Sequence, residues 1–168
     1  MAIVRRPSYQ WPAQEIVSIR TQLEDLAEVV QHFDGDNGVA AYLARFLVVR
    51  SCGYVEQTSF EVCRGYVREK SGGLVRSFAH SWLERTRNPT SDNLIELVGR
   101  FDSTKCNDFQ VFLDEDDQRL RRELDFLVDR RNRIAHGLNE GLASRKAIVL
   151  FEISKEVASW FISEFDPG

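Results

Sequence analysis

Proline placement is the feature that most constrains how this chain can fold. The four prolines of the 168-residue chain stand at positions 7, 12, 89 and 167, so two long stretches contain no residue that breaks a helix. Along both stretches apolar residues recur three and four positions apart, as on the buried face of an α-helix. No segment shows the sustained alternation of apolar and polar residues that is typical of a strand. The sequence therefore predicts one all-α domain, residues 1–168, built as a bundle of five or six helices.

Turn-forming residues divide the chain into these predicted helices. Glycine-containing segments near 34–38 and 72–73, and an Asn-Pro pair at 88–89, mark breaks. Ser91 is the expected N-cap of the helix that follows. An acidic run at 114–117 is expected to interrupt a later helix or to start its second half, because carboxylates stabilise the positive end of the helix dipole. The expected helices are 12–33, 39–69, 74–85, 91–101, 109–136 and 144–165.

Charge and cysteine content limit the classes of function. The net charge is −4, so no global positive field draws the protein onto nucleic acid, and RNA contact needs a local basic patch. Six arginines between positions 119 and 133 supply one. No apolar run approaches the ~20 residues of a membrane span, and the basic residues 1–11 lack the apolar segment of a signal peptide. Three cysteines without metal-ligand spacing predict reduced thiols in a cytoplasmic protein, with no metal and no cofactor.

The most informative segment is Arg131 to Gly137, at the end of the expected helix 109–136. It brings together His136, the side-chain amide of Asn132 and several guanidinium groups. A histidine can transfer protons near neutral pH, and an arginine can hold a phosphate through two parallel hydrogen bonds. These groups suffice to cut RNA without a metal. Histidine followed by glycine is also typical of an ordinary helix C-terminus, where imidazolium complements the dipole and glycine takes the left-handed turn.

Arg131 occupies an unusual position on its helix. At 100° per residue it lies about 20° from Leu120, in the middle of the apolar face. Arg130 and Arg133 fall on the opposite, solvated side. A guanidinium on a packing face is costly unless an anion or a wet cleft receives it. The predicted apolar face consists of Leu120, Leu124, Leu127, Ile134 and Leu138.

Glu56 is the expected partner of Arg131. It lies within an apolar face of the helix 39–69, where Gly53 would let another element approach closely. We expect Glu56 to fix the guanidinium at the rim of a cleft, although the same pair could serve only to orient two buried helices. The remaining members of this predicted face are Phe46, Val49, Phe60, Cys63 and Val67.

The geometry between Arg131 and His136 is open to two interpretations. Asn132 and His136 are four apart and share a side of the helix, but Arg131 and His136 differ by about 140°. Either the helix ends at His136 and Gly137 turns the ring back, or a two-fold dimer places a second copy of the motif alongside the first. The other histidines, at positions 32 and 80, are expected to be structural or solvated.

Arg131, Asn132 and His136 resemble the motif of the HEPN superfamily, in which an arginine and a polar residue precede a histidine near a helix end. Residues 124–137 look like those of stand-alone bacterial HEPN proteins, including the RiboL-PSP type. Residues 52–56 look like the long helix that precedes the motif in that group. The resemblance covers about 39–165 and implies a HEPN-like helical bundle.

The resemblance also implies a function. Many HEPN domains are metal-independent endoribonucleases that act as homodimers with a composite site, often as toxins or phage-defence effectors. By this resemblance Arg131, Asn132 and His136 would be catalytic, with Glu56 supporting them, while the adjacent Arg130 and Arg133 would contact RNA. Other HEPN domains are inactive and bind nucleotide or a partner protein, such as an antitoxin or a nucleotidyltransferase. We keep that as the alternative.

Overall fold

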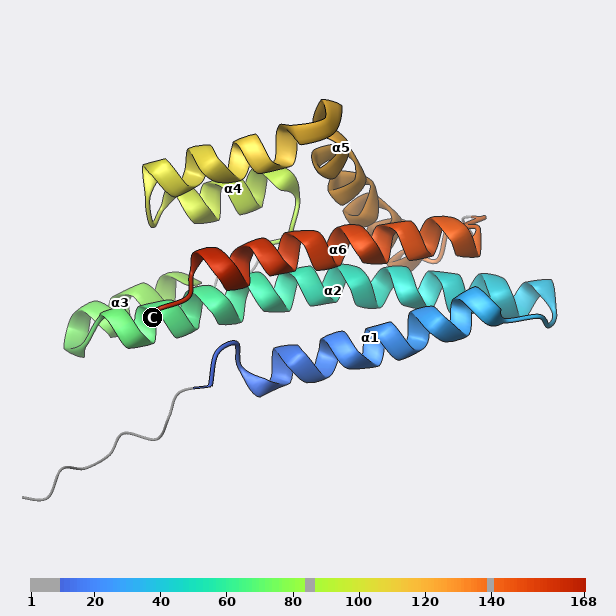
Figure 1. Cartoon of the computed structure of the whole chain (residues 1–168), viewed down its shortest axis with the longest axis horizontal. Coiled ribbons are helices and arrows are strands. Elements are labelled where there is room, and N and C mark those ends of the chain that lie inside the picture. The colour runs from blue at the N-terminus through green and yellow to red at the C-terminus, as the bar shows by residue number, and fades with distance from the viewer. Residues whose placement is uncertain (1–9, 84–86, 139–140) are drawn as a thin grey trace, which may run out of the picture.

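The computed structural model describes residues 10–83, 87–138 and 141–168, and within these ranges it contains six helices and no strand. α2 lies at the centre, with α1 along one side and α6 along another, and α5 crosses them (Figure 1). The predicted all-α architecture is confirmed. The helices are α1 (Gln14–His32), α2 (Asn37–Lys70), α3 (Gly73–Leu83), α4 (Ser91–Gly99), α5 (Ser103–Ala135) and α6 (Ser144–Glu164). The start of α5 differs most from expectation, at Ser103 in place of Phe109, and the expected end of α3 near residue 85 lies outside the described residues.

Capping side chains set where the helices begin. The side chain of Asp36 accepts hydrogen bonds from the backbone N–H groups of the first turn of α2, and Asp102 does the same for α5. The N-cap of α4 is Thr90, whose hydroxyl accepts from Asn93 N at 3.3 Å. The prediction that Ser91 caps α4 is therefore wrong by one residue. Ser91 is the first helical residue, and its polar groups are committed to α5 instead.

A break divides α5 into two parts that run in different directions (Figure 1). Glu115 is extended, and Asp116, Asp117 and Gln118 have φ values of 51°, 57° and 59°, in the left-handed region. The interruption predicted at the acidic run is thus confirmed. The second part carries Arg131 and crosses α2, so the break sets the direction from which Arg131 reaches α2.

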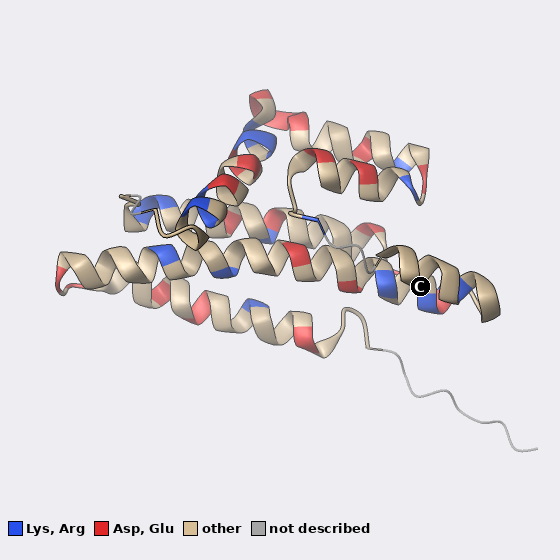
Figure 2. Ribbon diagram, turned by 180° about the vertical axis from the view of Figure 1, so that it is seen from behind, with Lys and Arg blue, Asp and Glu red and all other residues tan. Residues whose placement is uncertain are grey.

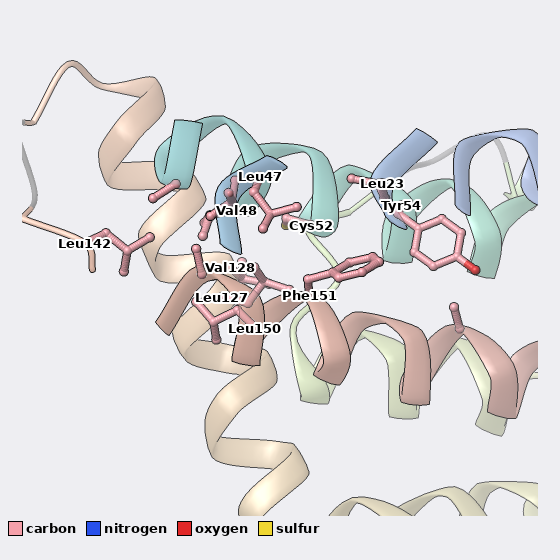
Figure 3. Packing of buried hydrophobic residues seen from close by; sticks show 14 of the residues in the cluster. Leu23, Leu47, Val48, Cys52, Tyr54, Leu127, Val128, Leu142, Leu150 and Phe151 are labelled. Atoms are coloured by element: carbon pink, nitrogen blue, oxygen red, sulfur yellow. The ribbon is translucent and has the colours of Figure 1, made fainter. Parts of the chain in front are cut away.

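The crossing of α5 over α2 is fixed by a fully buried cluster. Leu47 and Cys52 of α2 pack with Leu127 of α5 and with Phe151 of α6, and all are at most 1% exposed (Figure 3). Truncating a leucine in such a core to alanine costs about 2–5 kcal/mol. A second cluster, rich in aromatic rings and centred on Phe109, joins α4, α5 and α6. The backbone around Arg131 is therefore held by well-packed apolar contacts.

The predicted apolar face of α2 is wrong in its first half. Phe46 is 52% exposed, and Gly53 is exposed with nothing within 4 Å of an added Cβ, so no helix among the described residues approaches it closely. Farther along, Cys63 and Val67 are buried as expected. Because α2 packs against α1, α5 and α6 on different sides, its buried residues do not follow one stripe. A single helical wheel could not separate them.

α2 is also the one described helix that is long and apolar enough to cross a bilayer, a weak signal that core helices of globular proteins share. Its buried side chains include Leu47, Val48, Tyr54 and Val62. Packing against four neighbouring helices, α1, α3, α5 and α6, accounts for this apolar composition.

Candidate active site

Arg131 lies at the crossing of α5 and α2, and the predicted pair with Glu56 is confirmed. Its Nη2 donates to Glu56 Oε2 at 3.4 Å, and the two side chains are 23% and 36% exposed. The same nitrogen donates to Asn88 Oδ1 at 2.9 Å. The guanidinium is thus held between two acceptors while part of it remains open to solvent. Asn88 was not predicted, because it belongs to the irregular segment before α4 and no periodicity marks it.

The thiol of Cys52 lies beside the same guanidinium. Burial raises the pKa of Cys52, and a hydrogen bond and the positive charge of Arg131 oppose that shift only in part. The thiol is therefore protonated at neutral pH and acts as a small buried neighbour. Arg131 consequently lies at the edge of the apolar cluster, with Glu56 supplying the compensating charge.

His136 lies at the end of α5, and the structure confirms the helix end expected there. α5 ends at Ala135, His136 is the C-cap, and Gly137 follows with φ 75°. Gly137 N donates to Ile134 O and Leu138 N donates to Arg133 O, both at 3.0 Å. This pair of hydrogen bonds is the Schellman motif, which needs a left-handed residue at the position of Gly137.

The end of the helix also corrects the predicted apolar face of α5. Leu120, Leu124 and Leu127 are buried, but Leu138 is 50% exposed. It lies beyond the helix terminus, so the wheel no longer applies to it.

The structure does not join Arg131 to His136 within one chain. His136 is exposed and Asn132 is half-buried. No side-chain hydrogen bond of either residue is present in residues 10–83, 87–138 and 141–168. The cap places His136 at the surface, and no hydrogen bond among the described residues links its ring to Arg131. A site that uses both groups needs a substrate or a second chain between them.

The surface around the arginines at 119–133 carries less positive charge than the sequence suggests, because carboxylates pair with several of them. Arg119 pairs with Glu156 at 3.0 Å, Arg121 with Asp114 at 2.7 Å and Arg122 with Asp117 at 3.2 Å. Blue and red bands accordingly alternate along the second part of α5 (Figure 2). The predicted patch is therefore neutralised over its first half.

Arg130 differs from its expected place, whereas Arg133 is exposed as predicted. The side chain of Arg130 is only 22% exposed, because its guanidinium lies 4.5 Å from the centre of the Phe126 ring. Lys146 of α6 lies 4.9 Å from the same ring. Arg130 therefore packs on a ring of its own helix, in addition to carrying charge.

The other two histidines lie apart from this site. A ring nitrogen of His32, Nδ1, is 3.0 Å from the backbone oxygen of Glu28 at the end of α1. His80 is on α3, and its Nε2 is buried without a hydrogen-bond partner in the described part of the chain. In that part no group of three or more His, Cys, Asp or Glu residues could hold a metal ion.

Comparison with known proteins shows the family of this chain. No curated protein and no solved structure matches the chain. The model of the family described as RiboL-PSP-HEPN matches residues 8–165, which include all six helices and the whole Arg131–His136 segment. The chain therefore belongs to the RiboL-PSP-HEPN family.

Proposed function

We propose that this protein is a metal-independent endoribonuclease that acts as a homodimer in the cytoplasm, as a toxin or a phage-defence effector. Family membership supports a coarser statement, a ribonuclease or a nucleotide-binding module. The observation that carries the finer proposal is the fixed guanidinium of Arg131, held by Glu56 and Asn88 on the helix that ends at His136.

The proposed reaction uses the RNA's own nucleophile. The ribose 2′-hydroxyl attacks the adjacent phosphorus, the bond to the 5′-oxygen breaks, and the products carry a 2′,3′-cyclic phosphate and a 5′-hydroxyl. His136 accepts the proton of the 2′-hydroxyl or donates one to the leaving oxygen. Arg131 stabilises the charge that builds on the phosphoryl oxygens, and Asn132 orients the histidine or the phosphate. Arg130 and Arg133 contact flanking phosphates, which makes binding depend on salt.

A second copy supplies what one chain lacks. Tyr42 and Phe46 are 70% and 52% exposed, on the face of α2 that also carries Gly53 and Glu56. In the part of the chain that the structure describes, nothing lies within 4 Å of a Cβ added at Gly53, so a helix of another copy can approach there closely. A two-fold pairing over this face brings the Arg131 of one chain near the motif of the other.

Cleavage in the presence of EDTA tests the chemistry. Purified protein should convert RNA to fragments with cyclic phosphate ends and should leave DNA intact, because DNA lacks the 2′-hydroxyl. Arg131→Ala and His136→Ala should each abolish this cleavage. The matched controls are Arg122→Ala and His32→Ala, which remove the same residue types from exposed positions away from the site. Cleavage that persists in both site variants, or that requires added metal, rejects the mechanism.

Mixing the two inactive variants tests the composite site. In a dimer of one Arg131→Ala chain and one His136→Ala chain, one of the two shared sites keeps both groups. An equal mixture of the variants should therefore recover about a quarter of the wild-type rate, because half of its dimers are mixed and half of their sites are intact. No recovery, with mixed dimers demonstrated by mass, would place both groups in one chain.

One observation favours the alternative, a non-catalytic module. The guanidinium of Arg131 already has two acceptors, Glu56 and Asn88, and neighbouring arginines are paired with carboxylates. A binding module would form stable complexes with a nucleotide or with an antitoxin or nucleotidyltransferase, without RNA breakdown. Growth inhibition on overproduction that both site variants relieve would reject this alternative. Harmless accumulation of the unmodified chain would support it.

A further inference from the structure

A cavity borders the two residues that hold Arg131. It lies between α2, the segment before α4, and α4 itself, and its lining includes both Glu56 and Asn88. Because these two side chains accept hydrogen bonds from Arg131, the cavity and the guanidinium are neighbours. The apolar part of the lining comes from Phe60, Leu83, Leu94 and Leu97.

The polar groups of the cavity are partly unused. Asn93 Nδ2 donates to the backbone oxygen of Asn88 at 2.8 Å, which fixes the amide with its Oδ1 available. Across the described residues no hydrogen bond engages Asn93 Oδ1, Asn88 Nδ2 or Glu56 Oε1. The two arginines of the lining, Arg87 and Arg100, both bind the carboxylate of Glu96. Together with Glu56 the lining holds two carboxylates and two guanidinium groups, so its formal charges cancel. The cavity thus offers neutral amides and one carboxylate oxygen, and no cluster of unbalanced positive charge.

This chemistry fits a flat, neutral and polar ring better than a second phosphate. Proteins recognise single-stranded RNA by receiving unstacked bases against aromatic side chains and by hydrogen bonding to their edges. Phe60 supplies an aromatic wall, and the free acceptors of Asn93 and Glu56 can receive an exocyclic amino group. The cavity volume is about 60 Å³, which at ~10–15 Å³ per water corresponds to about four to six displaced waters.

We propose that this cavity is a base-binding subsite, which receives the base beside the phosphate held at Arg131. Its acceptors favour adenine, cytosine and guanine, which carry exocyclic amino groups, over uracil, which carries none. The inference rests on the proposed function, since Arg131 must bind the RNA phosphate for the base to reach the cavity.

Base preference in cleavage tests the subsite. The substrates are an all-uridine RNA and three matched RNAs with one adenosine, cytidine or guanosine at a fixed position. Wild-type protein should cut beside the substituted base at least about fivefold faster than in the all-uridine RNA. Asn93→Leu keeps the volume but removes the acceptor, so this ratio should fall to about one. Asn93→Asp keeps an acceptor oxygen and should retain the preference, and Asn107→Leu, on an exposed part of α5, should match wild type.

Binding separates this inference from the nuclease proposal. The same four RNAs with 2′-O-methyl riboses cannot be cleaved, and their affinities can be measured by fluorescence anisotropy. Wild-type protein that cuts no RNA would refute the nuclease proposal. The subsite would still be supported if this protein binds the RNAs with an exocyclic amino group more tightly than the all-uridine RNA, and if Asn93→Leu removes that difference in affinity. If wild-type protein binds all four RNAs with equal affinity and cuts them at equal rates, the subsite is overturned. The subsite is also overturned if Asn93→Leu lowers the affinity and the cleavage rate of all four RNAs by the same factor.

Discussion

Asp125 makes a contact whose loss should be large and measurable. Its Oδ1 accepts from Ser91 N at 2.8 Å, and its Oδ2 accepts from Ser91 Oγ at 2.7 Å. Ser91 is only 2% exposed, so Asp125→Ala leaves a buried N–H and a buried hydroxyl without their acceptor. A hydrogen bond to a charged group contributes about 1.5–3 kcal/mol, and two bonds from one carboxylate add less than twice that amount. We expect Asp125→Ala to lower the free energy of unfolding by about 3 kcal/mol.

Urea unfolding followed by tryptophan fluorescence measures this loss. Asp125→Ala should lower the midpoint while leaving the urea dependence unchanged, because the surface exposed on unfolding stays the same. Asp129→Ala is the matched control, one turn along the same helix with a side chain 54% exposed, and should change stability by at most about 0.5 kcal/mol. A loss below about 1 kcal/mol for Asp125→Ala, or an equal loss in the control, would show that the contact does not anchor α4.

Three further outcomes are expected. A double-mutant cycle on Glu56 and Arg131 should give a coupling of at most about 1 kcal/mol in urea unfolding, because both side chains are partly solvated; zero coupling would contradict the pair. Gly137→Ala should destabilise the protein by about 1 kcal/mol from backbone strain alone, since φ is 75° and space is open around an added Cβ, whereas Gly137→Asn should cost less. Burial raises the pKa of Cys63 above its ordinary value of 9.0, so the unfolded chain releases that proton first as pH rises. The contribution of Cys63 to the free energy of unfolding is then fully present below pH 9 and falls by up to ~1.4 kcal/mol per pH unit above it. Between pH 8 and pH 10 the free energy of unfolding should therefore fall less in Cys63→Ala than in wild-type protein.

The pairing of Arg131 with Glu56 could be predicted because both charges interrupt apolar patterns. Arg131 on the packing face of its helix needs an opposite charge, and Glu56 stands at an irregular position of the other long helix. Asn88 could not be predicted in the same way. It lies in an irregular segment whose path depends on tertiary packing, so its position relative to α5 leaves no periodic trace in the sequence.

The surface was harder to predict than the helices. Counting arginines from 119 to 133 indicated a basic patch, but their partners include Glu156 on α6, which is distant in sequence. Local sequence gives the charge of a helix, whereas the field at its surface depends on neighbours that only the fold supplies.

The contacts of α5 with the segment before α4 have a consequence for how that segment can move. Asp125 and Arg131 are six residues apart, about 9 Å along one helix, and hold Ser91 and Asn88 respectively. The segment before α4 is therefore bonded to α5 at two points, Asn88 and Ser91. An incoming anion that draws Arg131 away from Asn88 breaks only the contact at Asn88, and the contact of Asp125 with Ser91 remains. Residues 88–90 then stay joined to α4 through Asn93, and α4 stays docked on α5 through Asp125.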